Sequence, residues 1–374
     1  MATQLLDLFL ELCAIPSPPG EERAVADRVL AELRAAGLQP DEDGTGPETG
    51  STAGNLYCRL PATDGHGGAP ILLCAHLDTV PFEGRLEPVV DEDGVVRNAG
   101  GAILGADNKS AVVAMLEAAR RIVEQGRPHA GIELLFTTKE EVGLVGAVAF
   151  DRSRLAAQLG YVYDQAAPIG EIVLGAPFSQ EVVARFHGRP AHAGMYPEEG
   201  RSAIAAAARA VADLRLGRLD DETTANVGLI RGGTARNIVP EWCTIEIDAR
   251  SHDAARLADL VREMLETIGF AATLSDCEVE TTATPRYRGY RFRADDAVVR
   301  VARSGLERAG YAPTLGLSGG ASDANVFNDR GLPCLNIANG MAQIHTPDEH
   351  IAVADLERMV DVTLGIVDAA RHAA

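Results

Sequence analysis

The sequence predicts an α/β protein, in which a three-layer α/β/α domain carries an inserted, smaller domain of βαββαβ order. In residues 1–175, continuous apolar segments of strand length alternate with amphipathic helix patterns. Such strands are typical of a sheet with helices on both faces. Near residue 178 the pattern changes to strand, helix, two strands, helix and strand, and the first pattern then returns. We therefore expect a discontinuous domain, residues 1–177 and 284–374, interrupted by a ferredoxin-like domain of residues 178–283.

The first domain is expected to open with two amphipathic helices and to continue with apolar strands, a hairpin and a long helix. A glycine ends the long helix, and an Asp-Gly pair marks the hairpin turn. Small residues at 43–54 predict a surface loop. The predicted helices are 2–13, 21–36 and 108–126, the predicted strands are 54–60, 71–75, 131–137, 160–164 and 170–174, and the hairpin is 87–98.

The inserted domain is expected to contain four strands and two helices, after which the α/β pattern resumes. Its predicted strands are 180–188, 225–232, 242–250 and 271–280, and its predicted helices are 200–215 and 253–268. The elements expected after it are helices at 295–309, 322–329 and from about 353, and strands at 313–317 and 333–338.

Composition excludes several classes of partner. The 374 residues include 54 acidic and 34 basic ones, for a net charge of −20, which argues against nucleic acid and anionic membranes. We expect no membrane span, because no stretch is apolar enough. The first 20 residues lack a basic start and predict an amphipathic helix rather than a signal peptide. The six cysteines form no CxxC and lie mostly in apolar runs, so we expect buried thiols and a cytoplasmic protein.

Two polar side chains follow the predicted strand 71–75. His76 and Asp78 are two residues apart, so they face the same side if the strand geometry persists. A carboxylate beside a histidine fixes the tautomer and the orientation of the ring. This pair therefore suits a metal ligand and the residue that orients it.

Five further candidates lie at or near strand ends, where ligands bind in α/β sheets. Glu140 and Glu141 follow one strand, Asp164 ends another, Asp107 precedes the long helix, and His345 lies in a loop near the carboxyl end. Each has an ordinary alternative: a helix cap for Asp107, a solvated turn for the glutamates and a structural histidine. Their joint occurrence at strand ends favours a metal site.

The residue types and their number indicate two metal ions. Mixed imidazole and carboxylate ligands suit Zn²⁺, with Co²⁺ or Mn²⁺ as possible substitutes. A single catalytic zinc ion keeps about three protein ligands and one open position, so five ligands are too many for it. They suit two ions that share a bridging carboxylate and a bridging water.

The chain also resembles a known family, the dinuclear zinc exopeptidases, along nearly its whole length. Seven segments occur in the order found in that family: "HLDTVP", "GADNKSAVVAMLEA", "TTKEEVGLVGA", "YDQ", "GRPAHAG", "GGTARNIVP" and "HTPDEH". The family includes glutamate carboxypeptidase, aminoacylase and succinyl-diaminopimelate desuccinylase. This chain is most similar to its peptidase T-like (tripeptidase) branch, in which an Asp in a Y-x-D context, as at Asp164, is a metal ligand.

The resemblance implies how the metal ligands are shared. His76 and Asp164 would bind one zinc ion, and Glu141 and His345 would bind the other. Asp107 would bridge the two ions. The implied cofactor is thus two Zn²⁺ per subunit.

The resemblance also implies the catalytic residues. Asp78 would orient His76, and Glu140 would be the general base that takes a proton from the bridging water and hands it to the leaving amine. The family is known for a cis peptide bond directly after the bridging Asp. We therefore expect a cis bond between Asp107 and Asn108.

In the inserted domain the resemblance points to His192, Asn237 and Arg250. His192 matches a lid histidine that reaches the other subunit's active site and stabilises the oxyanion, which implies a homodimer through this domain. Asn237 matches a position near the substrate, and Arg250 matches an arginine that binds the substrate's carboxylate. The alternative for Arg250 is a surface ion pair with Asp248 or Asp253. Two other arginines of the segment are further alternatives: Arg231 and Arg236.

The function that these features favour is a cytoplasmic exopeptidase that removes the N-terminal residue of short peptides, especially tripeptides. The same site in an N-acyl-amino-acid amidohydrolase or a glutamate carboxypeptidase is the alternative, and a non-catalytic peptide-binding relative is the third. The complete set of ligands and base argues against the third. The remaining histidines are expected to be structural or surface residues: His66, His129, His187, His252, His350 and His372.

Overall fold

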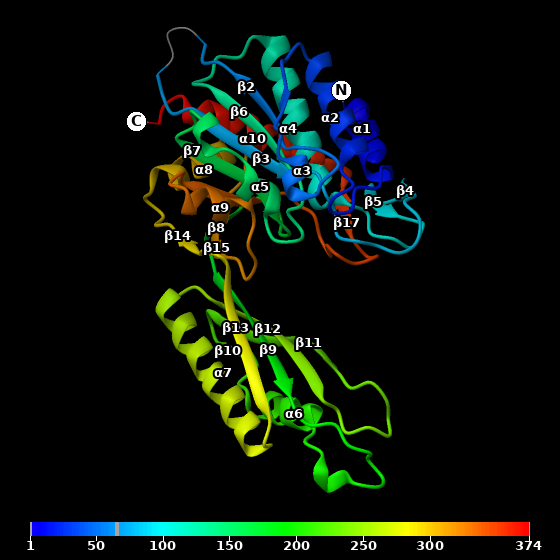
Figure 1. The fold of residues 1–374 in the computed structure, drawn as a ribbon. Coiled ribbons are helices and arrows are strands. Elements are labelled where there is room, and N and C mark those ends of the chain that lie inside the picture. Colours follow the sequence, from blue (N-terminus) through cyan, green and yellow to red (C-terminus); the bar gives the residue numbers. More distant parts are fainter. Residues whose placement is uncertain (1, 64–66, 374) are drawn as a thin grey trace. The chain divides into compact units, whose positions relative to one another are not determined.

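The computed structural model describes residues 2–63 and 67–373, so His66 lies outside the described residues. The chain forms two compact units. The first comprises the residues up to Gly175 together with those from Phe292 onward, and the second comprises Ala176–Arg291. Figure 1 follows the chain through both units.

A nine-stranded mixed sheet forms the centre of the first unit. The strand order is β1-β2-β6-β3-β7-β16-β8-β14, and β15 pairs with β8. The neighbours β6, β3, β7 and β16 run parallel, whereas β2 is antiparallel to β6. The strands are β1 (Asp41–Glu42), β2 (Leu56–Leu60), β3 (Ile71–His76), β6 (Ile132–Thr137), β7 (Leu159–Gln165), β8 (Glu171–Ala176), β14 (Tyr290–Arg291), β15 (Thr314–Leu317) and β16 (Cys334–Ala338).

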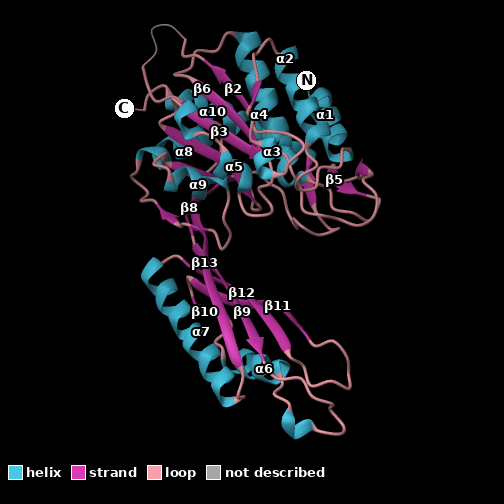
Figure 2. Ribbon diagram, in the orientation of Figure 1, coloured by secondary structure: helices cyan, strands magenta, loops and turns pink. Residues whose placement is uncertain are grey.

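Helices cover both faces of this sheet, which confirms the three-layer α/β/α prediction (Figure 2). Side chains alternate along β3: Leu73 and Ala75 join the core beneath α4, whereas Cys74 faces α9 and contacts Asp323. The helices are α1 (Ala2–Ala14), α2 (Arg23–Ala35), α3 (Gly46–Thr49), α4 (Ala106–Gln125), α5 (Val145–Ala149), η1 (Arg152–Arg154), α8 (Ala297–Arg308), α9 (Asp323–Asp329) and α10 (Val353–Ala370).

The predicted hairpin is present, but the predicted surface loop 43–54 is partly wrong. The hairpin strands are β4 (Pro88–Val90) and β5 (Val95–Asn98), and β17 (His350–Ala352), which was not predicted, pairs with β5. The segment 43–54 contains the short helix α3 and buries Ala53. The reason is the Asp43 carboxylate, which accepts the backbone N–H of Thr45 and of Asn55 and so folds the segment onto the domain.

The second unit has the predicted βαββαβ order with one extra edge strand. Its antiparallel sheet has the order β10-β11-β12-β9-β13, and α6 and α7 cover one face with a separate apolar core. The elements are β9 (Phe178–His187), η2 (Pro197–Glu199), α6 (Ala203–Asp213), β10 (Gly217–Asp220), β11 (Thr223–Gly232), β12 (Trp242–Ser251), α7 (Ala254–Leu274) and β13 (Glu278–Tyr287).

The boundary between α7 and β13 differs from the prediction. The helix continues to Leu274, through the residues expected to begin a strand, and β13 starts at Glu278. The reason is that Ile268, Ala271 and Ala272 bury one face at helical spacing. Because β13 pairs with β9 as far as Tyr287, the compact unit extends beyond the expected residue 283.

The six cysteines are free thiols, and five of them are buried, as expected. Across residues 2–63 and 67–373, no helix has both the length and the apolar character that a membrane crossing requires.

Candidate metal centre

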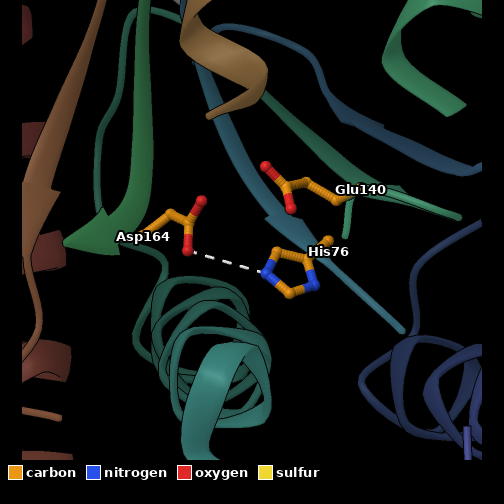
Figure 3. A group of neighbouring side chains, drawn as sticks. All are labelled: His76, Glu140 and Asp164. Atoms are coloured by element: carbon orange, nitrogen blue, oxygen red, sulfur yellow. Dashed lines mark ion pairs between the residues drawn. The ribbon is translucent and has the colours of Figure 1, made fainter. Parts of the chain in front are cut away.

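The candidate ligands of the first unit come together at one edge of the central sheet. The parallel strands β3, β6 and β7 deliver His76, the Glu140–Glu141 turn and Asp164 to this edge, because their carboxyl ends lie side by side. Figure 3 shows the side chains of His76, Glu140 and Asp164 pointing toward one another. The sheet register thus brings together residues up to 88 positions apart in the sequence.

Asp107 lies between the two histidines. Its Oδ1 is 3.2 Å from His76 Nε2, and its Oδ2 is 3.1 Å from His345 Nε2. His76 Nε2 is also 3.6 Å from Asp164 Oδ1, and His345 Nε2 is 3.2 Å from Glu141 Oε1. One carboxylate therefore faces both imidazoles with different oxygens, which is the geometry that a bridging ligand requires.

Two overlapping groups of side chains could each hold a metal ion. The first is His76, Glu140 and Asp164, and the second is His76, Asp107 and Glu141. In each group the potential ligand atoms lie within 4.8 Å of one another. The donor set fits divalent transition-metal ions, because imidazole nitrogens and carboxylate oxygens are the ligands that Zn²⁺ and its substitutes take.

The charges of this cluster point to cations. Burial raises the pKa of Glu140 well above its ordinary value, and the charge of Asp164 raises it further. Burial likewise raises the pKa of Asp164, with a further contribution from Asp107. Hydrogen bonds to Asp107 and Glu141 raise the pKa of His345 to about 10. Burial thus disfavours the charged carboxylates of Glu140 and Asp164, and hydrogen bonds favour the charged imidazole of His345. Divalent cations would supply the same neutralising charge.

Asp78 connects the first histidine to the turn that carries the two glutamates. The Nδ1 of His76 lies 2.9 Å from the backbone oxygen of Asp78 and 3.6 Å from its Oδ1. A proton on Nδ1 leaves Nε2 free for a metal ion. The Asp78 carboxylate also accepts the backbone N–H groups of Glu140 at 2.9 Å and Glu141 at 3.1 Å.

The start of α4 holds Asp107 in a non-helical conformation. The predicted cis bond between Asp107 and Asn108 is present. The carboxylate of Glu349 accepts the backbone N–H groups of Gly105 at 2.7 Å and Asp107 at 2.8 Å. Glu349 was missed by the sequence analysis, although it follows His345 by four residues within the motif "HTPDEH".

The three predicted substrate residues belong to the second unit. His192 is exposed, and its Nδ1 accepts the backbone N–H groups of Gly194 at 3.2 Å and Met195 at 3.1 Å. Asn237 is exposed in the loop before β12. Arg250, at the end of β12, donates from Nε to Asp248 Oδ2 at 2.7 Å, which is one of the two ion pairs that the sequence left open.

Comparison with known proteins gives the family. The sequence model of peptidase family M20/M25/M40 matches residues 72–369. The chain belongs to this family. As an M20-family member with this cluster of ligands, it is a hydrolytic metallopeptidase.

Three relatives of this M20-family peptidase are similar over almost the full length. The crystal structure of aminopeptidase PepT from Bacillus cereus is 38% identical, with a TM-score of 0.89 and 99% of both chains covered. That of a tripeptidase from Staphylococcus aureus is 34% identical, with a TM-score of 0.93, covering 100% of this chain and 99% of the other. A succinyl-diaminopimelate desuccinylase from Stenotrophomonas maltophilia is 30% identical over 95% of this chain and 96% of its own.

Proposed function

We propose that this M20-family peptidase is an exopeptidase that removes the N-terminal residue of short peptides, and that tripeptides are its preferred substrates. The observation that carries the proposal is the position of Asp107, whose two oxygens face His76 and His345 at 3.2 and 3.1 Å. The similarity to an aminopeptidase and a tripeptidase, at 38% and 34% identity, supports the substrate class.

The proposed cofactor is a pair of zinc ions in the first unit. His76 and Asp164 would hold one ion, Glu141 and His345 the other, and Asp107 both. When bound, such ions would polarise the scissile carbonyl and lower the pKa of the attacking water.

Glu140 is the proposed general base. Its carboxylate lies within 4.8 Å of the potential ligand atoms of His76 and Asp164, close enough for one water molecule to contact all three. Glu140 would take the proton of the attacking water and pass it to the leaving amine, so that the peptide carbon gains the hydroxyl oxygen as the C–N bond breaks. The backbone N–H of Glu140 donates a hydrogen bond to the Asp78 carboxylate, and this bond helps to fix the position of the Glu140 side chain.

His192 is the proposed donor to the oxyanion. Two backbone N–H groups occupy its Nδ1, so in the neutral ring the proton is on Nε2, which is then free to donate. By its family resemblance His192 would act in the active site of a second subunit, and the protein would be a homodimer through the second unit. In support, β11 pairs with β10 only from Thr223 to Ala225 and exposes Leu229 and Ile230 beyond that point.

Asn237 and Arg250 are the proposed substrate contacts, with Arg250 binding the C-terminal carboxylate of the peptide. Because Arg250 pairs with Asp248 at 2.7 Å, a substrate carboxylate would have to compete with that ion pair or share the guanidinium. The buried free cysteines are compatible with the proposed cytoplasmic location.

The second candidate function is hydrolysis of an acylated amino acid by the same residues. The 30% identity to a desuccinylase, over 95% of this chain, favours it. The two candidates differ in the group next to the scissile amide: a free amine in a peptide, and an acyl chain in the alternative.

The test is a matched set of substrates offered to protein loaded with zinc or cobalt. The set is a tripeptide, the dipeptide that shares its N-terminal residue, the N-acetylated tripeptide and an N-acetyl amino acid. Faster release of the free N-terminal residue from the tripeptide than from the other three, abolished by a chelator, is the expected result. A preference for the two acetylated compounds would replace the aminopeptidase proposal with the amidohydrolase one.

A further inference from the structure

The turn that carries Glu140 and Glu141, here named the catalytic turn (residues 138–146), is held from outside by buried side chains. Four successive backbone N–H groups at its start donate to side-chain oxygens of three residues. The donors are Thr138, Lys139, Glu140 and Glu141, and the acceptors are Asn55, Glu22 and Asp78. All three acceptors are fully buried.

These N–H groups need outside partners because the strand ladder ends just before them. The pairing of β6 with β3 stops at Thr137, and Lys139 then takes a left-handed conformation with φ of 53°. A buried N–H group without an acceptor is costly, so the turn keeps this shape only where acceptors are supplied.

Glu22 is the acceptor that lies furthest from the turn in the sequence. Its Oε1 accepts the N–H of Lys139 at 3.1 Å and of Gly20 at 2.9 Å, and its Oε2 accepts the hydroxyl of Ser51 at 2.6 Å. Glu22 precedes α2, and its side chain makes no cap bond to that helix. Its hydrogen bonds therefore join three segments: the loop before α2, the loop that contains Ser51, and the catalytic turn.

We propose that Glu22 is a positioning residue, which fixes Lys139 and through it the side chains of Glu140 and Glu141. The inference rests on the proposed roles of those two glutamates. Glu22 touches neither of them: it acts one residue upstream, whereas Asp78 acts on the two residues directly. Glu22 and Asp78 together accept three successive backbone N–H groups of the turn. If the bond to Glu22 is lost, the turn can shift relative to Asp78.

The contacts of Glu22 predict which substitutions preserve its role. A glutamine amide oxygen can accept the N–H groups of Lys139 and Gly20, and its NH₂ group can donate to the Ser51 hydroxyl. Alanine can make none of these hydrogen bonds. Aspartate keeps the charge, but its side chain is one methylene shorter, so its oxygens lie further from these partners. Hydrogen-bond geometry rather than charge should therefore decide the outcome.

The control is a second buried carboxylate that accepts backbone N–H groups away from the catalytic turn. Glu133, at the other end of β6, accepts the N–H of Ala156 at 3.0 Å and of Ala157 at 2.8 Å, as well as the hydroxyl of Tyr57 at 2.6 Å. Glu133→Ala thus reports the general cost of deleting such a group.

The experiment compares Glu22→Ala, Glu22→Gln, Glu22→Asp and Glu133→Ala with the wild type. The readouts are kcat and KM for the tripeptide, cobalt affinity, and hydrogen exchange of the amides at 138–141. For Glu22→Ala and Glu22→Asp we expect a loss of about 10–100-fold in kcat or cobalt affinity and faster exchange, as for other residues that support metal ligands. Glu22→Gln should stay within about twofold of the wild type, a near-neutral change in free energy.

Three results would overturn the proposal: equal losses in Glu22→Ala and Glu133→Ala, unchanged exchange at 138–141 in Glu22→Ala, or no rescue by glutamine. If Glu22→Ala does not fold, Glu22→Asp decides by the same readouts. Exchange and cobalt affinity need no substrate. If the wild-type protein hydrolysed no peptide, the proposed function would be refuted. Hydrogen exchange and cobalt affinity would still test the role of Glu22.

Discussion

Asp78 accepts the backbone N–H of Glu140 at 2.9 Å across 62 positions of the chain. The same carboxylate lies 3.6 Å from His76 Nδ1, so one buried group contacts both a proposed metal ligand and the segment that carries the proposed base. This explains why two adjacent glutamates follow an apolar strand. Their backbone N–H groups bond to Asp78 beside His76, and their side chains point into the candidate metal site.

Replacing Asp78 with asparagine should weaken both functions of this carboxylate. The amide keeps the shape, but its NH₂ group cannot accept an N–H, so one of the bonds from Glu140 and Glu141 is lost. We expect a loss of about 10–100-fold in activity or metal affinity, measured by steady-state kinetics and cobalt titration. Asp91→Asn is the control, since the half-buried Asp91 also accepts two backbone N–H groups, from Asp93 and Val95. Equal effects of the two variants would contradict the prediction.

Glu140→Gln should remove the base and leave the ions in place. The amide is nearly isosteric but cannot take a proton, and general bases of this kind contribute about 10²–10⁴ in rate. The measurement is kcat together with the number of bound metal ions per chain. Because Glu140 also lies near His76 and Asp164, the ion count is decisive. Loss of one ion from the variant would make Glu140 a ligand and refute its assignment as the base.

Removing the metal ions should destabilise the first unit. Without cations the buried carboxylates near Asp107 must either take up protons or repel one another. An ion that binds only the folded state stabilises it by about 2.7 kcal/mol when its free concentration is 100 times its Kd. The expected result is a lower Tm after chelation that zinc or cobalt restores. His345→Ala should bind fewer ions and recover less. A Tm that chelation leaves unchanged would argue against ions at this site.

Three of the five proposed metal ligands have a clear local signal in the sequence. His76, Glu141 and Asp164 lie at or just after the ends of apolar strands, and parallel pairing brings such ends together. Asp107 and His345 needed the family resemblance, since a helix cap and a loop histidine are common. What the sequence left open was how the oxygens of Asp107 divide between the two histidines, which depends on tertiary placement.

The supporting residues could not be predicted, because nothing local marks them. Glu22, Asn55 and Glu349 are polar residues of surface-like segments, and they are buried only because distant backbone N–H groups need acceptors. The end of α7 was mispredicted for a related reason. The residues 271–274 suit a strand or a helix equally well, and packing against the sheet selects the helix.

A glycine substitution tests whether the catalytic turn tolerates any displacement. A Cβ at Gly146 would lie 2.2 Å from the oxygen of Thr138 and 2.5 Å from Oδ1 of Asn55, the acceptor of the Thr138 N–H. Gly146→Ala should therefore push the start of the turn away from its acceptor, cost about 1–3 kcal/mol of stability and lower kcat. Urea unfolding and steady-state kinetics measure the two effects.

Gly269→Ala is the matched control for that substitution. Gly269 lies inside α7, and a Cβ there would meet nothing within 4 Å. Alanine in a helix interior is favoured over glycine by about 0.5–1 kcal/mol, so this variant should be slightly more stable and equally active. If Gly146→Ala kept full activity while losing stability, the turn would adjust without moving Glu140. The precise hydrogen bonding of the turn would then not be needed for catalysis.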